Sequence, residues 1–163
     1  MRRKDKEVSE IKELIKIIED SKIMHLGLSR NNLPDVIPLN FGYQYDGNII
    51  KIYFHSARVG KKNDYIQSNN KCAVEMTSYF ELEKGVTACE WSAFHESVMI
   101  EGNISLVENE EEIKNAMDLI MKRYGFIGIP IYEEKYLKAM AVYCIEVESI
   151  SGKRNMPKII KED

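Results

Sequence analysis

The sequence lacks the features that mark several large protein classes. Cysteine is scarce, and Cys72, Cys89 and Cys144 are widely separated, with no CxxC pair and no histidine at zinc-ligand spacing. We therefore expect no metal site, and reduced, buried thiols at Cys72 and Cys144, which lie in apolar runs. No apolar run reaches the ~20 residues that a membrane-spanning helix needs, so no membrane partner is expected.

Charge and targeting signals are equally sparse. The start of the chain is basic but has no apolar core of a secretory signal, which predicts a cytoplasmic protein. The 23 basic and 26 acidic residues give a net charge of −3, so nothing indicates a nucleic-acid partner. There is no GxSxG, HExxH or P-loop motif, and the carboxylates are scattered without a recognisable acid–base pair.

What is present indicates one globular domain. The chain has 163 residues, 44% hydrophobic and 30% charged, which is enough to bury a real core. It contains no internal repeat, linker or low-complexity tract. We therefore expect a single domain over residues 1–163.

The strongest local pattern lies in residues 36–70. Two strand-like runs, residues 36–45 and 49–54, flank an Asp46-Gly47 pair, which predicts a tight hairpin with a type I′ turn. Pro34 and Pro38 punctuate the first run, and proline in a strand predicts an edge, a bulge or a strand start. An interrupted strand leaves free backbone groups for a ligand.

A basic loop follows the second run. Gly60 precedes Lys61 and Lys62 at the start of a possible helix over residues 63–68. Free backbone N–H groups, the helix dipole and ammonium charges converge at such a place, which suits an anion. Exposed lysine pairs are also common, so the loop alone fits a solvated surface as well.

The remaining elements follow from periodicity and capping signals. Residues 9–20 predict an amphipathic helix, and a longer helix opens at Asn109 with Glu112 and stops before Gly125. We expect further strands at residues 24–29, 72–76, 97–106 and 140–147, a short helix at 132–139, a loop at 77–86 and a frayed tail at 151–163. Six or seven strands joined mostly as hairpins predict a mainly β, antiparallel barrel with flanking helices.

Several runs together resemble one known family. PLNFGY at residues 38–43, IYFHSA at 52–57 and GKK at 60–62, with MRRKDKE at the start and SVMIEG at 97–102, resemble the FMN-binding split-barrel flavoproteins. Within them the chain is most similar to the Nim-type proteins, a group related to pyridoxamine 5'-phosphate oxidase and to nitroimidazole resistance. The resemblance runs from Arg2 to about Lys153. It implies a split β-barrel and a homodimer with FMN at the interface.

The resemblance also implies which residues meet the cofactor. Lys61, Lys62 and Ser56 would hold the phosphate, and Ser97 would contribute from the partner subunit. The full set of implied cofactor-binding residues is Pro38, Leu39, Asn40, Phe41, His55, Ser56, Lys61, Lys62, Trp91 and Ser97. Trp91 has core packing as its alternative role. Lys153, in Ser151-Gly152-Lys153, matches a family feature near the C-terminus and would approach the cofactor.

The implied function is an FMN-dependent reductase of the Nim type, passing electrons from a reduced pyridine nucleotide or another donor to a small nitroaromatic molecule. His55 is the candidate catalytic residue, because it can titrate near neutrality; its alternative is a neutral hydrogen-bonding role. Vitamin B6 oxidation is not expected, since the C-terminal arginine- and tryptophan-bearing segment of true pyridoxamine-phosphate oxidases is missing. A flavin-binding carrier or stress sensor and a haem-binding split barrel remain alternatives.

Overall fold

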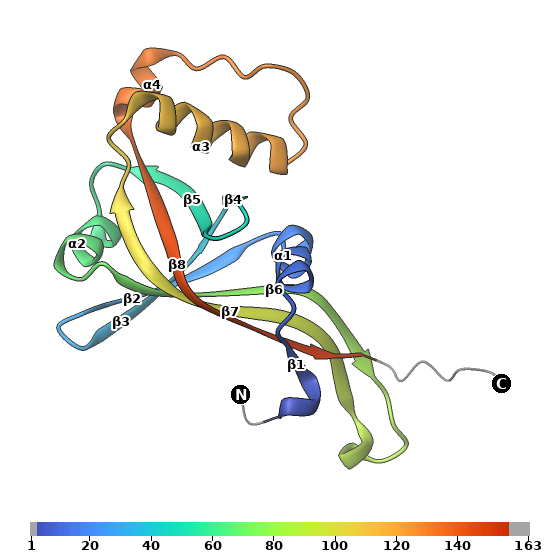
Figure 1. Cartoon of the computed structure of the whole chain (residues 1–163). Coiled ribbons are helices and arrows are strands. Elements are labelled where there is room, and N and C mark those ends of the chain that lie inside the picture. The colour runs from blue at the N-terminus through green and yellow to red at the C-terminus, as the bar shows by residue number, and fades with distance from the viewer. Residues whose placement is uncertain (1–2, 157–163) are drawn as a thin grey trace.

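The computed structural model describes residues 3–156, which form one antiparallel sheet with helices around it (Figure 1). The strand order is β3-β2-β6-β7-β8-β5-β4, with β1 paired to β8. The strands are β1 (Glu7–Val8), β2 (Met24–Arg30), β3 (Leu33–Leu39), β4 (Gly42–Tyr45), β5 (Ile50–Ala57), β6 (Lys71–Glu83), β7 (Ser92–Leu106) and β8 (Met140–Asn155). The helices are α1 (Ile11–Asp20), α2 (Lys61–Ser68), α3 (Glu110–Arg123) and α4 (Glu134–Ala139), with 3₁₀ turns η1 (Lys4–Lys6) and η2 (Ala88–Glu90).

This architecture confirms the predicted mainly β fold with flanking helices. The two predicted amphipathic helices are α1 and α3, and the Asn109 side chain caps α3 by accepting the N–H of Glu112 at 3.0 Å. Within the described residues, no helix is long and apolar enough to span a membrane.

Apolar side chains gather in two clusters. The larger one fills the inner side of the curved sheet and includes α1; its fully buried members include Ile17, Met24, Leu26, Phe41, Ile52, Phe54, Val74, Met76, Val98 and Ile145. The smaller one lies where α3 packs against β5 and β8, around Tyr53, Ala116, Met117, Ile120 and Val142. The outer side of β5 is therefore covered by α3, and only its C-terminal end remains free for other contacts.

The predicted single strand over residues 36–45 is wrong, because it is two strands with different partners. Leu39 at the end of β3 pairs with Met24 of β2, whereas Gly42 at the start of β4 pairs with Tyr53 of β5. In the described part of the chain, no ladder joins β3 to β5. The chain thus crosses from one edge of the sheet to the other within two residues, and the sheet is left unclosed between β3 and β5.

A cluster of side chains fixes this crossover at Phe41. The guanidinium of Arg123, at the end of α3, lies 4.0 Å from the Phe41 ring centroid and donates to Ile18 O at 2.8 Å and to Ser21 O. Tyr124 also donates from its hydroxyl to Lys22 O at 2.7 Å. The C-terminal ends of α1 and α3 are therefore tied together over the crossover.

The turn chemistry differs from the sequence prediction. Of Asp46 and Gly47, only Gly47 has a positive φ (100°), and the Asp46 carboxylate accepts the N–H groups of Asn48 and Ile49 at 2.8 and 2.9 Å. This is an Asx-stabilised loop and not the predicted type I′ turn, so the prediction is wrong. The type I′ dihedrals occur instead between β2 and β3, where Asn31 and Asn32 have φ of 50° and 63°.

Two segments predicted as irregular are regular strands. Residues 77–86 were expected to form a loop, but β6 continues to Glu83 and pairs with β7, so residues 79–96 form a hairpin that extends away from the body (Figure 1). We call this hairpin the arm. The predicted frayed tail is wrong for Ser151–Asn155, which belong to β8, and residues 157–163 lie outside the described part.

The close contact between β4 and α3 generates a stability prediction. A Cβ on Gly42 would lie 2.7 Å from Ile120 N and 2.9 Å from the carbonyl carbon of Leu119, both backbone atoms of α3. Gly42→Ala should therefore destabilise the protein by ~1–3 kcal/mol, since α3 must shift. Urea unfolding measures this, with Gln44→Ala, at an exposed position further along the same strand, as a control; equal stability of the two variants would contradict the packing.

Candidate functional site

The unclosed part of the sheet is a seam between two strand edges. One edge is residues 36–40 at the end of β3, and the other is residues 54–57 of β5, which pairs only with β8 there. One end of the seam is closed by an ion pair, with Lys61 Nζ 2.6 Å from Asp35 Oδ1, and the other by the Asn40-Phe41 crossover. In the described part of the chain the backbone groups of both edges have no strand partner and are available to a ligand. β3 pairs with β2 without a break through Pro34 and Pro38, so the prolines mark an edge strand, one of the predicted alternatives, and not an interrupted one.

The start of α2 provides a cluster of donors at one end of the seam. Gly60 precedes the helix with a φ of 136°, a conformation that favours glycine, and its carbonyl accepts the N–H groups of Asn63 and Asp64. In the described part of the chain, the N–H groups of Lys61 and Lys62 have no backbone acceptor. The helix begins two residues earlier than predicted, so both lysines belong to its first turn, where an anion is favoured.

The two lysines have different electrostatic surroundings. Lys61 is exposed, and its hydrogen bond to Asp35 raises its pKa. Lys62 is half-buried, with its ammonium 5.7 Å from the Phe54 ring centroid, and burial lowers its pKa. Among the described residues, no carboxylate forms an ion pair with Lys62. Lys62 therefore carries a partly desolvated positive charge that is not compensated by the protein, which is the property expected of an anion-binding residue.

His55 lies on the outer side of β5 at the same end of the seam. Burial lowers its pKa, and the positive charge of Lys62 lowers the pKa further. Both effects favour the neutral imidazole, which donates or accepts a hydrogen bond without carrying a charge. This favours the neutral alternative for His55 in the free protein.

Two residues that sequence reasoning missed hold the basic loop in place. Asn63 is buried and donates from Nδ2 to Ala57 O at 2.9 Å, while Arg58 donates from Nε to Lys138 O at 2.6 Å. The hydroxyl of Ser56 donates its single hydrogen to Ala57 O at 3.0 Å. No periodicity or motif identifies Asn63 or Arg58, because their acceptors are backbone carbonyls whose positions depend on the fold.

The structure brings together most of the predicted site residues around the seam. Pro38, Leu39 and Asn40 lie on one edge, and His55, Ser56, Lys61 and Lys62 lie on or beside the other. Phe41 follows them at the crossover, and its side chain is fully buried beneath Arg123, so this side chain does not face the seam.

Trp91 and Ser97 lie elsewhere in the chain. Ser97 pairs with Lys153 of β8, whereas His55 pairs with Val142, and these two β8 positions are separated by about 35 Å of extended strand. Trp91, on the arm, is half exposed and donates from its indole to Gly85 O at 3.0 Å, so the core-packing alternative for Trp91 is wrong. A single chain therefore does not combine Trp91, Ser97 or Lys153 with Lys62.

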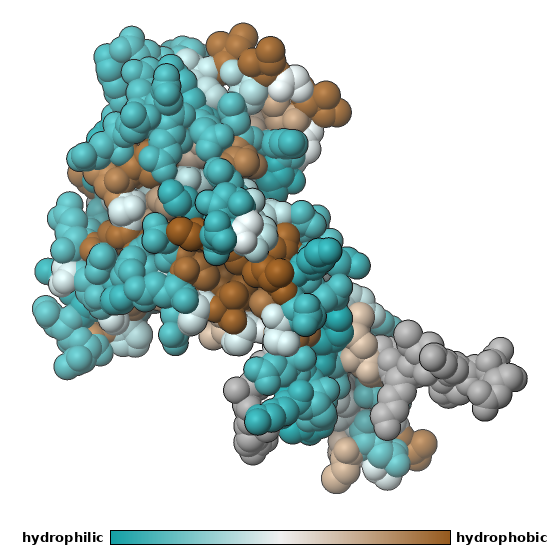
Figure 2. Space-filling view, in the orientation of Figure 1, coloured by the Kyte–Doolittle hydropathy of each residue, from teal (hydrophilic) through white to brown (hydrophobic). Residues whose placement is uncertain are grey.

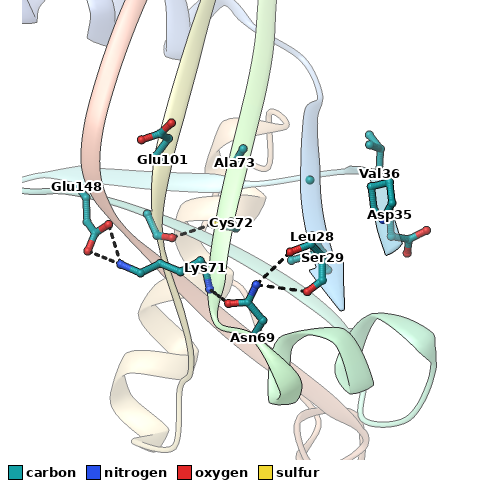
Figure 3. A pocket seen from close by; sticks show the side chains of 13 residues that line it. Leu28, Ser29, Asp35, Val36, Asn69, Lys71, Cys72, Ala73, Glu101 and Glu148 are labelled. Atoms are coloured by element: carbon teal, nitrogen blue, oxygen red, sulfur yellow. Dashed lines mark hydrogen bonds and ion pairs between the residues drawn. The ribbon is translucent and has the colours of Figure 1, made fainter. Parts of the chain in front are cut away.

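Two recesses lie near these elements. One, of about 560 Å³, is on the outer face of β2, β3, β6 and β7, where Gly27, Ala73 and Gly102 leave space between Val36 and the Lys71–Glu148 ion pair (Figure 3). The other, of about 310 Å³, lies at the end of β5 and is lined by His55, Ser56, Ala57, Tyr136, Ala139 and Met140. The second recess is next to the donor cluster and is called the α4 crevice below.

Comparison with protein families gives a match over most of the chain. Residues 10–154 match the family described as pyridoxamine 5'-phosphate oxidase. Among curated proteins, no match was found.

Solved structures with the same fold include proteins with several different descriptions. A protein from Bacteroides thetaiotaomicron, provisionally assigned to 5-nitroimidazole antibiotic resistance, is 26% identical, with a TM-score of 0.78 over 90% of this chain and 85% of that chain. A flavocytochrome from Azotobacter vinelandii is 19% identical, with a TM-score of 0.75 over 96% of this chain and 72% of that chain. An FAD and heme binding protein from Mycobacterium smegmatis is 15% identical, with a TM-score of 0.78 over 92% and 73%.

The electrostatic coupling between Lys62 and His55 can be measured directly. Lys62→Met should raise the pKa of His55, because it removes a nearby positive charge, whereas Lys61→Met should change that pKa less, since Asp35 already neutralises Lys61. The measurement is an NMR titration of the histidine ring protons in the free protein. A His55 pKa that responds equally to both substitutions, or to neither, would contradict the electrostatic coupling of His55 to Lys62.

Proposed function

Because the chain belongs to the pyridoxamine 5'-phosphate oxidase family, we propose that it is an FMN-binding flavoprotein and a Nim-type reductase. It passes electrons from a reduced pyridine nucleotide or another donor to small nitroaromatic molecules. The relative that is 26% identical and provisionally assigned to 5-nitroimidazole resistance supports this acceptor class.

The observation that carries the cofactor proposal is the uncompensated charge of Lys62. Its half-buried ammonium and the free N–H groups at the start of α2 form a donor set that fits one terminal phosphate. The Ser56 hydroxyl would join this set by exchanging its hydrogen bond to Ala57 O for one to the phosphate. The space around Gly60 is open, since a Cβ there would meet no atom within 4 Å. A single monoester phosphate next to a strand seam is the arrangement that FMN requires, and it does not require the second phosphate of FAD.

The seam is the place for the flavin ring. Pro38 lacks an N–H group, and the edge residues from Val36 to Asn40 carry backbone groups that no strand between residues 3 and 156 pairs on that side. Leu39 and Asn40 would therefore contact the ring mainly through the backbone. The contribution proposed for Phe41 is limited to its backbone as well, because its side chain is buried.

When bound, FMN supplies the two electrons that convert a nitro group to a nitroso group. The same conversion takes up two protons and releases one water molecule. The side chain placed to hold or deliver a proton is His55, whose neutral ring carries one N–H. A phosphate bound at Lys62 would offset the charge that lowers the pKa of His55, so cofactor binding would move His55 toward the range in which it exchanges protons at neutral pH.

The site is proposed to be completed by a second copy of the chain. The arm exposes large apolar side chains that its own chain does not cover: Phe80, Leu82, Val86 and Trp91 are 66%, 52%, 98% and 51% exposed. Figure 2 shows one face of the molecule, and on this face a hydrophobic patch lies on the body, above the arm. A two-fold dimer that covers these side chains would place Trp91 and Ser97 of one copy beside the seam of the other.

The proposal that FMN binds here predicts that substitution of Lys62 weakens FMN binding more than substitution of Lys61. Lys62→Ala should weaken FMN binding roughly tenfold or more, since one charge-assisted contact of ~1.5–3 kcal/mol is lost, and should leave the stability of the apo-protein nearly unchanged. Lys61→Ala is the matched control and should have a smaller effect, because Lys61 is already paired with Asp35. Flavin fluorescence during titration of the apo-protein gives both affinities, and a protein that never binds FMN would refute the proposal.

The reductase assignment predicts that His55 affects turnover more than binding. His55→Ala should reduce donor-dependent nitro-reduction per bound flavin by ~10²-fold or more while FMN affinity changes little. His25→Ala, at an exposed histidine paired with Glu75 at 3.0 Å, is the control. Retained turnover per flavin with weaker FMN binding would show that His55 only supports the loop. Absence of nitro-reduction in the wild type would favour the alternative that the protein is a flavin-binding carrier without turnover.

The dimer proposal predicts twice the chain mass of 18.9 kDa in light scattering. Phe80→Glu, on the arm, should shift the protein toward monomer and weaken FMN binding in parallel, because the charge opposes burial of the arm. Ile49→Glu, at the tip of the β4–β5 loop, should do neither. A monomer that still binds FMN with full affinity would rule out the shared site.

A further inference from the structure

The α4 crevice is a defined recess next to the donor cluster. Its walls come from the end of β5, from α4 and from the first residue of β8. Ala57 pairs with Met140 in the β5–β8 ladder, and Arg58 donates to Lys138 O at 2.6 Å. The helix that forms one wall is therefore attached to the strand end and the loop that carry His55 and Lys62.

The lining of the crevice is apolar apart from three polar side-chain groups. His55, Ser56 and Tyr136 supply an imidazole and two hydroxyls, whereas Ala57, Ala139 and Met140 supply aliphatic and thioether surface. Tyr136 also adds a phenol ring, and its side chain is 57% exposed. Apolar walls with a few convergent polar groups are typical of a small-molecule site.

The size of the crevice limits what it can hold. Its volume of about 310 Å³ is at the lower end of the ~300–1,000 Å³ range of small-molecule pockets. That volume suits a single-ring compound, which is the size of the proposed electron acceptor.

We propose that the α4 crevice is the acceptor site and that Tyr136 determines its specificity, by stacking on a planar, single-ring aromatic or heteroaromatic compound whose polar substituent reaches His55. This inference rests on the proposed function, because it names the acceptor pocket of that same flavin site. Lys135, whose ammonium lies 4.7 Å from the Tyr136 ring centroid, contacts the ring and helps to hold it. Offset stacking and thioether contacts from Met140 then select flat rings over aliphatic molecules.

The test measures binding without turnover. Oxidised, FMN-loaded protein is titrated calorimetrically with 2-methyl-5-nitroimidazole, and FMN affinity is measured separately for every variant. Tyr136→Leu should weaken binding of the nitroimidazole by about three- to tenfold, the loss expected when an aromatic pair is removed, while Tyr136→Phe should keep it within about twofold. Tyr45→Leu, at an exposed tyrosine beyond the opposite end of β5, is the matched control and should change nothing.

The outcomes separate this inference from the proposed function. Binding that depends on the Tyr136 ring supports the acceptor site even if nitro-reduction is never observed, in which case only the reductase assignment fails. Nitroimidazole affinity that is the same in Tyr136→Leu and wild type, or undetectable in wild type, overturns the inference even if turnover is found. A parallel loss of FMN affinity in Tyr136→Leu overturns it too, because Tyr136 would then act on the cofactor loop.

Discussion

The exchange of strand partners at Asn40-Phe41 is the constraint on which the rest of the structure depends. A strand that follows β2 up to Leu39 and then pairs with β5 from Gly42 cannot also close the sheet between β3 and β5. The crossover is held because Phe41 is buried under Arg123, which at the same time binds the last carbonyls of α1. Among the described residues, two strand edges thus remain unpaired in a fold that a packed core supports.

Because Lys61 forms an ion pair with Asp35, the adjacent residues Lys61 and Lys62 have different roles. Asp35 comes from β3, so its pairing with Lys61 ties the two edges of the seam together at one end. Lys62, one residue further, points back over Phe54 and stays without a partner among the described residues. One lysine therefore closes the seam, and the other keeps a charge that is available to an anion and that also lowers the pKa of His55.

The fold divides the predicted cofactor-binding residues into two groups. His55, Ser56 and Lys62 meet at the end of β5, whereas Ser97 and Trp91 lie toward the arm. The arm is a regular extension of β6 and β7 that leaves large apolar side chains uncovered, which is costly unless another surface covers them. The proposed site shared between two copies of the chain would bring the two groups together and cover these side chains.

Short-range signals in the sequence suffice to predict the amphipathic helices, the capped start of α3, the strand after Asp46-Gly47, and the glycine and two lysines at the start of a helix. These depend on side-chain periodicity and on capping, which act within a few residues. The division of residues 36–45 between two strands, the burial of Phe41, the pairing of Asp35 with Lys61 and not Lys62, and the continuation of the sheet into the arm follow from the tertiary structure. Burial and charge pairing depend on which strands become neighbours, and strand order is a property of the whole sheet that no short pattern encodes.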